Sequence, residues 1–264
     1  MQVVEWGSFI EKNRTAQPET AMTIGVFDGV HRGHQRLIEK IVRQGPNPTA
    51  VTFRQSPKRV ISPDAAGGAI LSLSQKLGIF ERLGVLQTIL IDFSEDFSKL
   101  KGQEFIDLLI KCGNLTYLVV GSNFKCGYQL DTDAGLIKQL NDARGIKTDV
   151  VPPVLDGAYP VSSSRIRRAI AAGDLAGAQA GLGRYVAVDL TGTAPECAGE
   201  EVFFDLASQG RVLPPDGRYP SIAYEINITE GKKTEIRLDH GKLFIPSAFN
   251  PVRGVELLSG SQGE

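Results

Sequence analysis

The chain has 264 residues, of which 42% are hydrophobic and 22% are charged, and its formal net charge is −1. This length can bury one large core, or a main domain together with a smaller one. The longest apolar runs are only as long as a strand, which argues against a membrane-spanning helix. The near-neutral charge argues against a strongly basic nucleic-acid-binding protein.

The three cysteines, Cys112, Cys126 and Cys197, lie far apart in the chain. Their odd number and wide spacing fit neither a disulfide framework nor a paired metal site. The N-terminus has neither the basic patch nor the apolar stretch of a secretory signal. We therefore expect a protein of the reducing cytoplasm.

The first two-thirds of the chain alternates apolar strands with amphipathic helices. Continuous apolar runs predict strands at 21–27, 49–53, 86–91, 116–121 and 147–151. Between them, helical patterns lie near 33–44, 74–83, 101–111 and 133–144. This alternation predicts an α/β fold, with a Rossmann-like parallel sheet covered by helices on both faces. Ligands of such sheets bind where the carboxyl ends of the strands lead into helices.

A glycine- and histidine-rich segment, GVFDGVHRGH at residues 25–34, follows the first predicted strand and opens a helix. Gly25 and Gly29 allow the backbone to approach a ligand closely. Gly33 begins a helix whose free amides and positive dipole end favour phosphate. His31 and His34 could donate hydrogen bonds to one phosphate whose charge grows in a transition state.

Other readings of this segment are a metal pair or two surface histidines. A metal site would need a third ligand, and the chain's remaining histidine, His240, lies in the predicted second domain. The glycine patterns of dinucleotide-binding proteins and of P-loop proteins are both absent. A phosphate site is therefore the favoured interpretation.

Loops after two further strands offer weaker candidates. After the fourth strand, Asn123 could reach a ligand and Phe124 could stack on a flat ring. A strand-end turn with a core phenylalanine explains the same residues equally well. After the second strand, an anion contact by Arg54, Lys58 or Arg59 competes with plain solvent exposure.

A serine- and arginine-rich segment, SSSRIRR at 162–168, follows a proline-containing loop at 152–161. Its serines can cap a helix near 164–172, and a second short helix is predicted at 174–182. Hydroxyls, free amides and guanidinium groups together can hold a polyphosphate, although a serine cap before a solvated basic face is an alternative. We expect this segment at the same sheet edge as the histidines, which suggests a nucleoside triphosphate.

From Tyr185 onward the pattern changes to short β-branched and aromatic runs separated by glycine, proline and aspartate turns. This pattern predicts a small antiparallel sheet or barrel. We therefore expect two domains, at residues 1–183 and 184–264.

Taken in order, these motifs resemble the bacterial bifunctional riboflavin kinase/FAD synthetase family. The resemblance covers most of residues 20–186, and it rests on TIGVFDGVHRGHQRLI at 23–38, VTF at 51–53, LSLSQKLGIFERLGV at 71–85, FSEDFSKLKGQEFI at 93–106, VVGSNFKCG at 119–127, SSSRIRRAIAAGD at 162–174 and LGRY at 182–185. The wider HxGH nucleotidyltransferase superfamily shares only the first motif and a looser form of the serine–arginine motif.

The resemblance implies that the protein transfers AMP from ATP to FMN, giving FAD and pyrophosphate, with Mg²⁺ neutralising the triphosphate. It implies a catalytic role for His31, His34 and Arg167. It also implies ATP contacts by Gly25, Phe27, Asp28, Gly29, Asn123, Ser162, Ser163 and Ser164, and flavin contacts by Ser56 and Phe124. The Mg²⁺ ligands and the oligomeric state are left open, and neither nucleic acid nor membrane is expected as a partner.

Several positions depart from the family pattern. The family's T-F-x-P-H-P reads Thr52-Phe53-Arg54-Gln55-Ser56-Pro57 here, so its histidine is missing, and Cys126 replaces a second phenylalanine. The last serine of the serine–arginine motif, Ser164, stands where the family has threonine.

The second domain departs further from the family's kinase half. Where the family has its G-F-P-T-A-N signature, this chain reads VFFDL at 202–206, although LPPDGRY at 213–219 resembles the family's barrel turn. We therefore predict that riboflavin kinase activity is lost. The alternatives are an inactive flavin- or nucleotide-binding protein, or a nucleotidyltransferase with another phosphorylated acceptor.

Overall fold

The computed structural model describes residues 1–11, 18–61, 67–225 and 230–259. The chain forms two compact units. The first comprises Met1–Ala65 and Lys76–Pro160, and the second comprises Ala66–Gln75 and Val161–Glu264. The second unit therefore includes a short segment from the first third of the chain. The predicted domain boundary near residue 184 is a different division and stays a prediction.

A six-stranded parallel sheet forms the centre of the first unit, in the order β1-β4-β3-β2-β5-β8. Its strands are β1 (Gln2–Glu5), β2 (Thr20–Ile24), β3 (Thr49–Phe53), β4 (Gln87–Ile91), β5 (Leu115–Gly121) and β8 (Lys147–Val151). The five predicted strands are confirmed. The edge strand β1 was not predicted, because only one of its four side chains is buried and its sequence carries no apolar run.

Helices alternate with these strands, and they are α1 (Trp6–Ile10), α2 (Arg32–Gln44), α3 (Pro57–Ile61), α4 (Leu73–Arg82), α5 (Glu95–Lys99), α6 (Gly102–Gly113) and α7 (Ala134–Asp142). Of these, α2, α4, α6 and α7 were predicted, whereas the five-residue helices α1, α3 and α5 were not. Short elements between them are β6 (Lys125–Cys126), which pairs with β7 (Thr132–Asp133), and the hairpin of β9 (Leu155–Asp156) and β10 (Tyr159–Pro160). The boundary between the units falls within α4, between Gln75 and Lys76.

Helices cover both faces of the sheet. On one face, buried residues of α1, α6 and α7 form a hydrophobic cluster with alternate strand residues such as Met22, Ile24 and Leu118. The neighbouring strand residues point the other way, because side chains alternate along a strand. There α2 packs closely: a Cβ on Gly45, just after α2, would lie 2.1 Å from the Cβ of Ala21. The parallel sheet is thus buried on both sides, as its continuous apolar runs predicted.

The strand order places the first loops of the fold at a favourable position for a ligand. From the central strand β2 the chain moves to β3 and β4 on one side, and later to β5 and β8 on the other. Such a reversal opens a crevice outside the carboxyl ends of the two strands that flank it, here β2 and β5. The loop after Ile24 and the turn after Gly121 both begin at this point.

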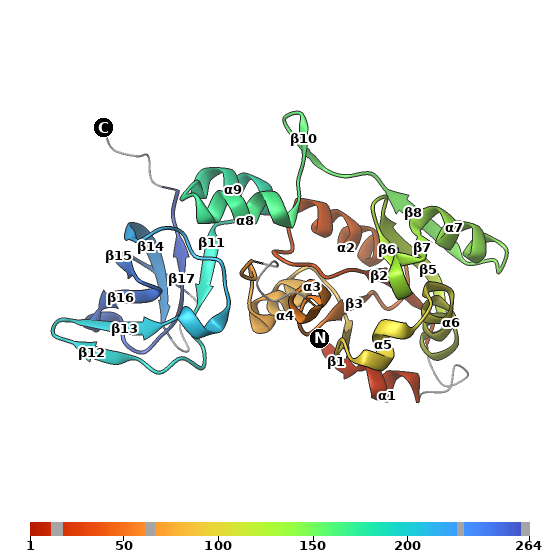
Figure 1. Ribbon diagram of the computed structural model, residues 1–264, viewed down its shortest axis with the longest axis horizontal. Helices are drawn as coiled ribbons and strands as arrows, with labels where there is room; N and C mark the ends of the chain where they lie inside the picture. The colour runs from red at the N-terminus through yellow and green to blue at the C-terminus, as the bar shows by residue number, and fades with distance from the viewer. Residues whose placement is uncertain (12–17, 62–66, 226–229, 260–264) are drawn as a thin grey trace. The chain divides into compact units, whose positions relative to one another are not determined.

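The longer segment of the second unit, from Val161 onward, begins with two helices, α8 (Ser163–Ala171) and α9 (Leu175–Leu182), at the predicted positions. A seven-stranded antiparallel sheet follows, in the order β11-β17-β14-β15-β16-β13-β12 (Figure 1). Its strands are β11 (Val186–Asp189), β12 (Glu196–Ala198), β13 (Glu201–Asp205), β14 (Gly217–Glu225), β15 (Lys232–Asp239), β16 (Lys242–Pro246) and β17 (Val252–Leu257). The predicted antiparallel architecture is confirmed.

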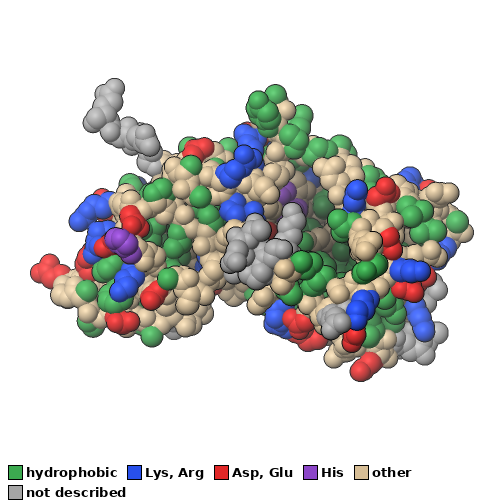
Figure 2. Space-filling model, in the orientation of Figure 1, with side chains coloured by type: hydrophobic (Ala, Val, Ile, Leu, Met, Phe, Trp, Pro, Cys, Tyr) green, Lys and Arg blue, Asp and Glu red, His purple; other side chains and the backbone are tan. Residues whose placement is uncertain are grey.

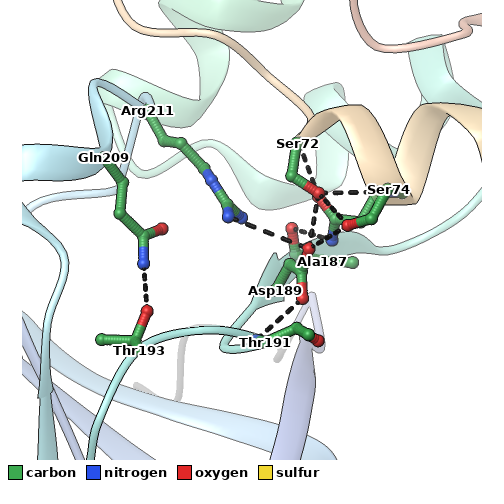
Figure 3. Close-up of polar contacts among 9 residues, drawn as sticks. Ser72, Ser74, Ala187, Asp189, Thr191, Thr193, Gln209 and Arg211 are labelled. Carbon is green, nitrogen blue, oxygen red and sulfur yellow. Dashed lines mark hydrogen bonds and ion pairs between the residues drawn. The ribbon is translucent and has the colours of Figure 1, made fainter.

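A polar network centred on the buried carboxylate of Asp189 joins the segment at 66–75 to this sheet (Figure 3). The carboxylate of Asp189, at the end of β11, accepts hydrogen bonds from the hydroxyls of Ser72 (2.5 Å) and Ser74 (2.6 Å). The backbone amide of Thr191 donates to the second carboxylate oxygen at 3.0 Å. The guanidinium of Arg211 lies 4.0 Å from the same carboxylate, and both side chains are about nine-tenths buried.

Backbone contacts reinforce this junction. Ala69 bridges to Arg211 in parallel register, its amide donating to the carbonyl of Gly210 and its carbonyl accepting from the amide of Val212. The backbones approach so closely that a Cβ on Gly68 would lie 2.1 Å from the nitrogen of Val212. The segment at 66–75 is therefore an integral part of the second unit.

No helix within the described ranges is long and apolar enough to cross a membrane. On the face shown in Figure 2, basic and acidic side chains are interspersed rather than gathered into one large patch of a single sign. This distribution agrees with the near-neutral net charge of the sequence.

Candidate functional site

The loop between β2 and α2, residues 25–31, is called the histidine loop below. Its backbone is held in an uncommon conformation: φ is +54° at Phe27, +82° at Gly29 and +38° at Val30. Positive φ is easy for glycine, but it is strained for phenylalanine and more so for a β-branched valine. Strain of this kind persists only where the surrounding structure imposes it, and it is concentrated at functional sites.

His31 and His34 are brought together at the N-terminus of α2, as the motif predicted. His31 is the N-cap residue, and its Nδ1 accepts a weak hydrogen bond from the backbone amide of His34 at 3.4 Å. The two imidazoles stack with their ring centres 3.5 Å apart and their planes inclined by 19°. Because Nδ1 of His31 accepts, its neutral ring carries the proton on Nε2, which makes that atom a hydrogen-bond donor.

Gly33 has no side chain and so leaves space for the His31 ring. A Cβ at this position would lie 3.1 Å from Cε1 and 3.2 Å from Nδ1 of His31. A larger residue would therefore require the imidazole to shift by a few tenths of an ångström. The glycine of the HxGH pattern serves side-chain packing here, in addition to opening the helix.

The buried side chain of Phe27 holds the histidine loop against the core of the first unit. Its side chain is fully buried and makes edge-to-face contacts with His34, at 5.2 Å between ring centres, and with Phe80 of α4, at 5.4 Å. A Cβ on Gly25 would lie 3.2 Å from the Phe27 ring. The roles of Gly25, Phe27, Asp28 and Gly29 in binding ATP stay predictions. Phe27 could contact a ligand through its backbone, because its ring is covered by protein.

Lys76 is a feature of the site that the sequence analysis did not identify. Its side chain, on α4, is only 8% exposed, and its Nζ donates to the carbonyls of Val26 (3.3 Å) and Phe53 (2.7 Å) and to Oγ1 of Thr52 (3.2 Å). Burial lowers the pKa of Lys76 to about 8, while the carboxylate of Asp28 acts in the opposite direction. One signal was available: Lys76, Ile79 and Phe80 share the buried side of their helix.

The lowered pKa of Lys76 predicts a pH-dependent stability. Above about pH 8 the folded protein releases this proton, whereas the unfolded chain keeps it until about pH 10.5. The free energy of unfolding therefore gains up to about 3 kcal/mol from this group as the pH rises through that interval. We expect urea unfolding at about pH 7 and about pH 10 to show this gain in the wild type relative to Lys76→Met. A difference between the two proteins that does not change with pH would contradict it.

The turn after β5 lies at the same carboxyl edge of the sheet as the histidine loop. Asn123 is exposed there, and Phe124 is half-buried against the hydrophobic cluster of the sheet. Phe124 therefore behaves as the core phenylalanine of the alternative interpretation, and its stacking on a flavin stays a prediction. Cys126, which replaces the family's second phenylalanine, also packs on this cluster, and burial raises the pKa of its thiol to about 12.

After β3, the sequence offered Arg54, Lys58 or Arg59 as an anion contact; the structure engages Arg54 in ion pairs, and the side chains of Lys58 and Arg59 lie outside the described ones. Arg54 donates from Nη2 to Glu5 (2.8 Å) and from Nε to Asp92 (2.9 Å). With two carboxylate partners, Arg54 is neutralised by the protein itself. Ser56 is half-buried, and its carbonyl accepts from the amide of Val60 in α3. The flavin contact of Ser56 stays a prediction.

The serine–arginine segment belongs to the second unit, whereas the histidine loop belongs to the first. Ser162 is the N-cap of α8, and its hydroxyl accepts from the amide of Arg165 at 3.3 Å, which confirms the predicted cap. Ser163 and Ser164 occupy the first turn, and Nε of Arg167 donates to the carbonyl of Gly68 at 2.8 Å. That these residues hold the phosphates of ATP stays a prediction.

His240 lies apart from the other two histidines, on the second unit. Its Nδ1 is 2.5 Å from the carboxylate of Asp239, and its backbone amide donates to Asp216 at 3.0 Å. The carboxylate of Asp239 raises the pKa of this exposed imidazole. Among the described residues, His240, Asp239 and Asp216 form the one group of three side chains whose ligand atoms lie close enough to hold a metal ion. Within those residues, no such group of three lies at the histidine loop.

Together, these contacts describe a site in the first unit that suits an anionic ligand. A helix N-terminus, an imidazole N–H and glycine-lined backbone converge at the switch point of a parallel sheet. Such groups can bind a phosphate and stabilise negative charge that develops on it during a transfer reaction.

Comparisons with known proteins agree with this geometry. The family model described as FAD synthetase matches residues 13–165. The bifunctional riboflavin kinase/FMN adenylyltransferase of Escherichia coli strain K12 is 29% identical over 215 residues, which are 78% of this chain and 69% of that protein. The FAD synthetase of Listeria monocytogenes is 28% identical over 226 residues, covering 83% of this chain and 88% of that one.

Among solved structures, one named a macrolide-efflux protein from Streptococcus pneumoniae superimposes with a TM-score of 0.78. The match covers 100% of this chain and 94% of that one, at 24% sequence identity. At this identity the likeness establishes the fold alone. It confirms the arrangement of a parallel α/β sheet followed by an antiparallel sheet.

Proposed function

The chain belongs to the FAD synthetase family, and from this premise we propose that it joins AMP from ATP to FMN, producing FAD and pyrophosphate. In this reaction a phosphate oxygen of FMN attacks the α-phosphorus of ATP. The bond between the α-phosphorus and the bridging oxygen breaks, and pyrophosphate leaves with the electron pair. The reaction needs no covalent enzyme intermediate, so positioning and charge stabilisation carry the catalysis.

The observation that carries this proposal is the stacked pair His31–His34 at the N-terminus of α2. Negative charge grows on the α-phosphate as the attacking oxygen approaches. An Nε2–H of His31 and the amides of the first helical turn are fixed donors for that charge, and fixed donors need no reorganisation during the reaction. A site that only bound a nucleotide would gain little from a strained loop that holds two imidazoles.

Mg²⁺ would accompany ATP in this proposal. Mg²⁺ prefers oxygen ligands and is commonly held by one or two carboxylates together with substrate phosphates. The histidine loop supplies one such group, the half-buried carboxylate of Asp28. This donor set suits a metal that arrives with the triphosphate, where its charge would neutralise the phosphates.

We also propose that the second unit lacks riboflavin kinase activity. At the stretch that stands where the family has its kinase signature, Phe204 and Leu206 are buried and Asp205 accepts a hydrogen bond from the amide of Ala207. Phe203 packs on Phe244 and lies under the ammonium of Lys242. These apolar side chains cannot replace the threonine and asparagine that the signature supplies for a metal–nucleotide complex.

A product assay tests both parts. Purified protein is incubated with ATP and Mg²⁺ and with either FMN or riboflavin, and flavins are separated by chromatography. We expect FAD from FMN and no FMN or FAD from riboflavin. FMN formed from riboflavin would refute the loss of kinase activity. Bound ATP without FAD from either flavin would refute the acceptor and favour another phosphorylated acceptor or a binding protein.

A further inference from the structure

Lys76 connects the ends of two neighbouring strands beneath the histidine loop. One acceptor of its ammonium, the carbonyl of Val26, lies within the loop, and another, the carbonyl of Phe53, is the last of β3. Oγ1 of Thr52 completes the set, because it accepts from Lys76 at 3.2 Å and donates to the Val26 carbonyl at 3.1 Å. The ammonium thus holds two strand ends through three oxygens.

The position of Val26 gives these bonds their significance. The residue that follows it, Phe27, is the first with a positive φ, and Val30, directly before His31, is the last. A loop with strained residues keeps its shape only if neighbouring groups over-determine it. The hydrogen bonds of Lys76 and Thr52 fix the backbone at the beginning of this strained stretch.

Burying an ammonium group costs free energy, so a lysine without a specific role is not expected at position 76. A methionine of similar volume would fill the same space without desolvating a charge. Helix α4 could therefore pack against the sheet with an apolar residue at this position. What a methionine could not do is donate hydrogen bonds to the loop.

We propose that Lys76 is a positioning residue of the nucleotidyl-transfer site, which fixes the histidine loop so that His31 and His34 face the reacting phosphate. Its effect on turnover rests on the proposed function, whereas its effect on the histidines does not. Lys76 acts through the backbone of the loop, and no contact between its side chain and the substrate is required.

The test compares Lys76→Met with Arg82→Met, which removes an exposed cation from the same helix. Two quantities are measured in the full-length protein: kcat and KM for ATP in FAD synthesis, and the imidazole signals in NMR spectra of protein labelled at histidine. The chain has three histidines, so His240 on the second unit is an internal reference.

For Lys76→Met we expect kcat to fall by about tenfold or more with KM for ATP changed by less than about threefold, because the loss concerns transition-state contacts. The signals of His31 and His34 should shift, while that of His240 stays in place. Arg82→Met should change neither quantity. Unchanged His31 and His34 signals with unchanged kcat in folded Lys76→Met would overturn the proposal and leave Lys76 a purely structural residue.

A second variant keeps the proposal testable if Lys76→Met does not fold. Thr52→Val preserves shape but removes the hydroxyl that links Lys76 to the Val26 carbonyl. It should shift the same two histidine signals by a smaller amount, and unchanged signals would count against the proposal. If the wild type forms no FAD, the proposed function fails, yet the histidine signals of these variants still decide whether Lys76 positions the loop.

Discussion

Replacing His31 or His34 by alanine should lower kcat for FAD formation by about 100- to 1,000-fold, the usual loss when one donor to a developing charge is removed. ATP binding should weaken far less, because the amides of α2 remain in place and the imidazoles act mainly in the transition state. The measurement is a full kinetic analysis of His31→Ala and His34→Ala, with ATP affinity determined separately by calorimetry.

The two variants should not be additive. The rings stack at 3.5 Å, and the His34 amide donates to His31, so each histidine holds the other in position. The double variant should therefore lose little more than the worse single variant. His240→Ala is the matched control, because its imidazole is exposed on the second unit. Weakened ATP binding with normal turnover at saturation would contradict the assigned role.

The second large effect concerns stability. Asp189→Ala should lower the free energy of unfolding of the second unit by about 3–5 kcal/mol, because it leaves the buried guanidinium of Arg211 without its carboxylate. The hydroxyls of Ser72 and Ser74 lose their acceptor as well (Figure 3). Burial alone would raise the pKa of Asp189, but the hydrogen bonds from Ser72, Ser74 and Thr191 outweigh it and the pKa is lowered.

Urea unfolding followed by two probes measures this effect. Trp6, the single tryptophan, reports the first unit by fluorescence, and circular dichroism reports both units. Asp205→Ala is the control: its exposed carboxylate accepts one backbone amide, so we expect a loss of about 1 kcal/mol. A loss for Asp189→Ala no larger than that of the control would show that solvent reaches and compensates Arg211.

Local sequence signals predicted much of this fold. Continuous apolar runs located β3 and β8 to the residue, and the serines at 162–164 were predicted to supply a helix cap, because strand runs and caps depend on neighbouring residues. The N-cap role of His31 was less evident, because histidine is not among the usual capping residues. It becomes visible only when the ring is seen folded back over Gly33.

Features that depend on distant contacts were not predictable in this way. Lys76 reads as one charge in an amphipathic helix, and its acceptors lie 50 residues away at Val26, 24 at Thr52 and 23 at Phe53. The membership of residues 66–75 in the second unit likewise rests on partners at Asp189 and Arg211, more than a hundred residues later. Sequence periodicity carries no information on such pairings.

Each unit is built from two separate segments of the chain, which limits where the protein can be truncated and how it can evolve. The chain passes from one unit to the other three times, at residues 65/66, 75/76 and 160/161. A fragment cut after Pro160 would retain Ser72 and Ser74 but lose their acceptor, Asp189. No single cut can therefore release two complete parts. Selection for a foldable chain would therefore act on the antiparallel sheet whether or not that sheet has an enzymatic activity of its own.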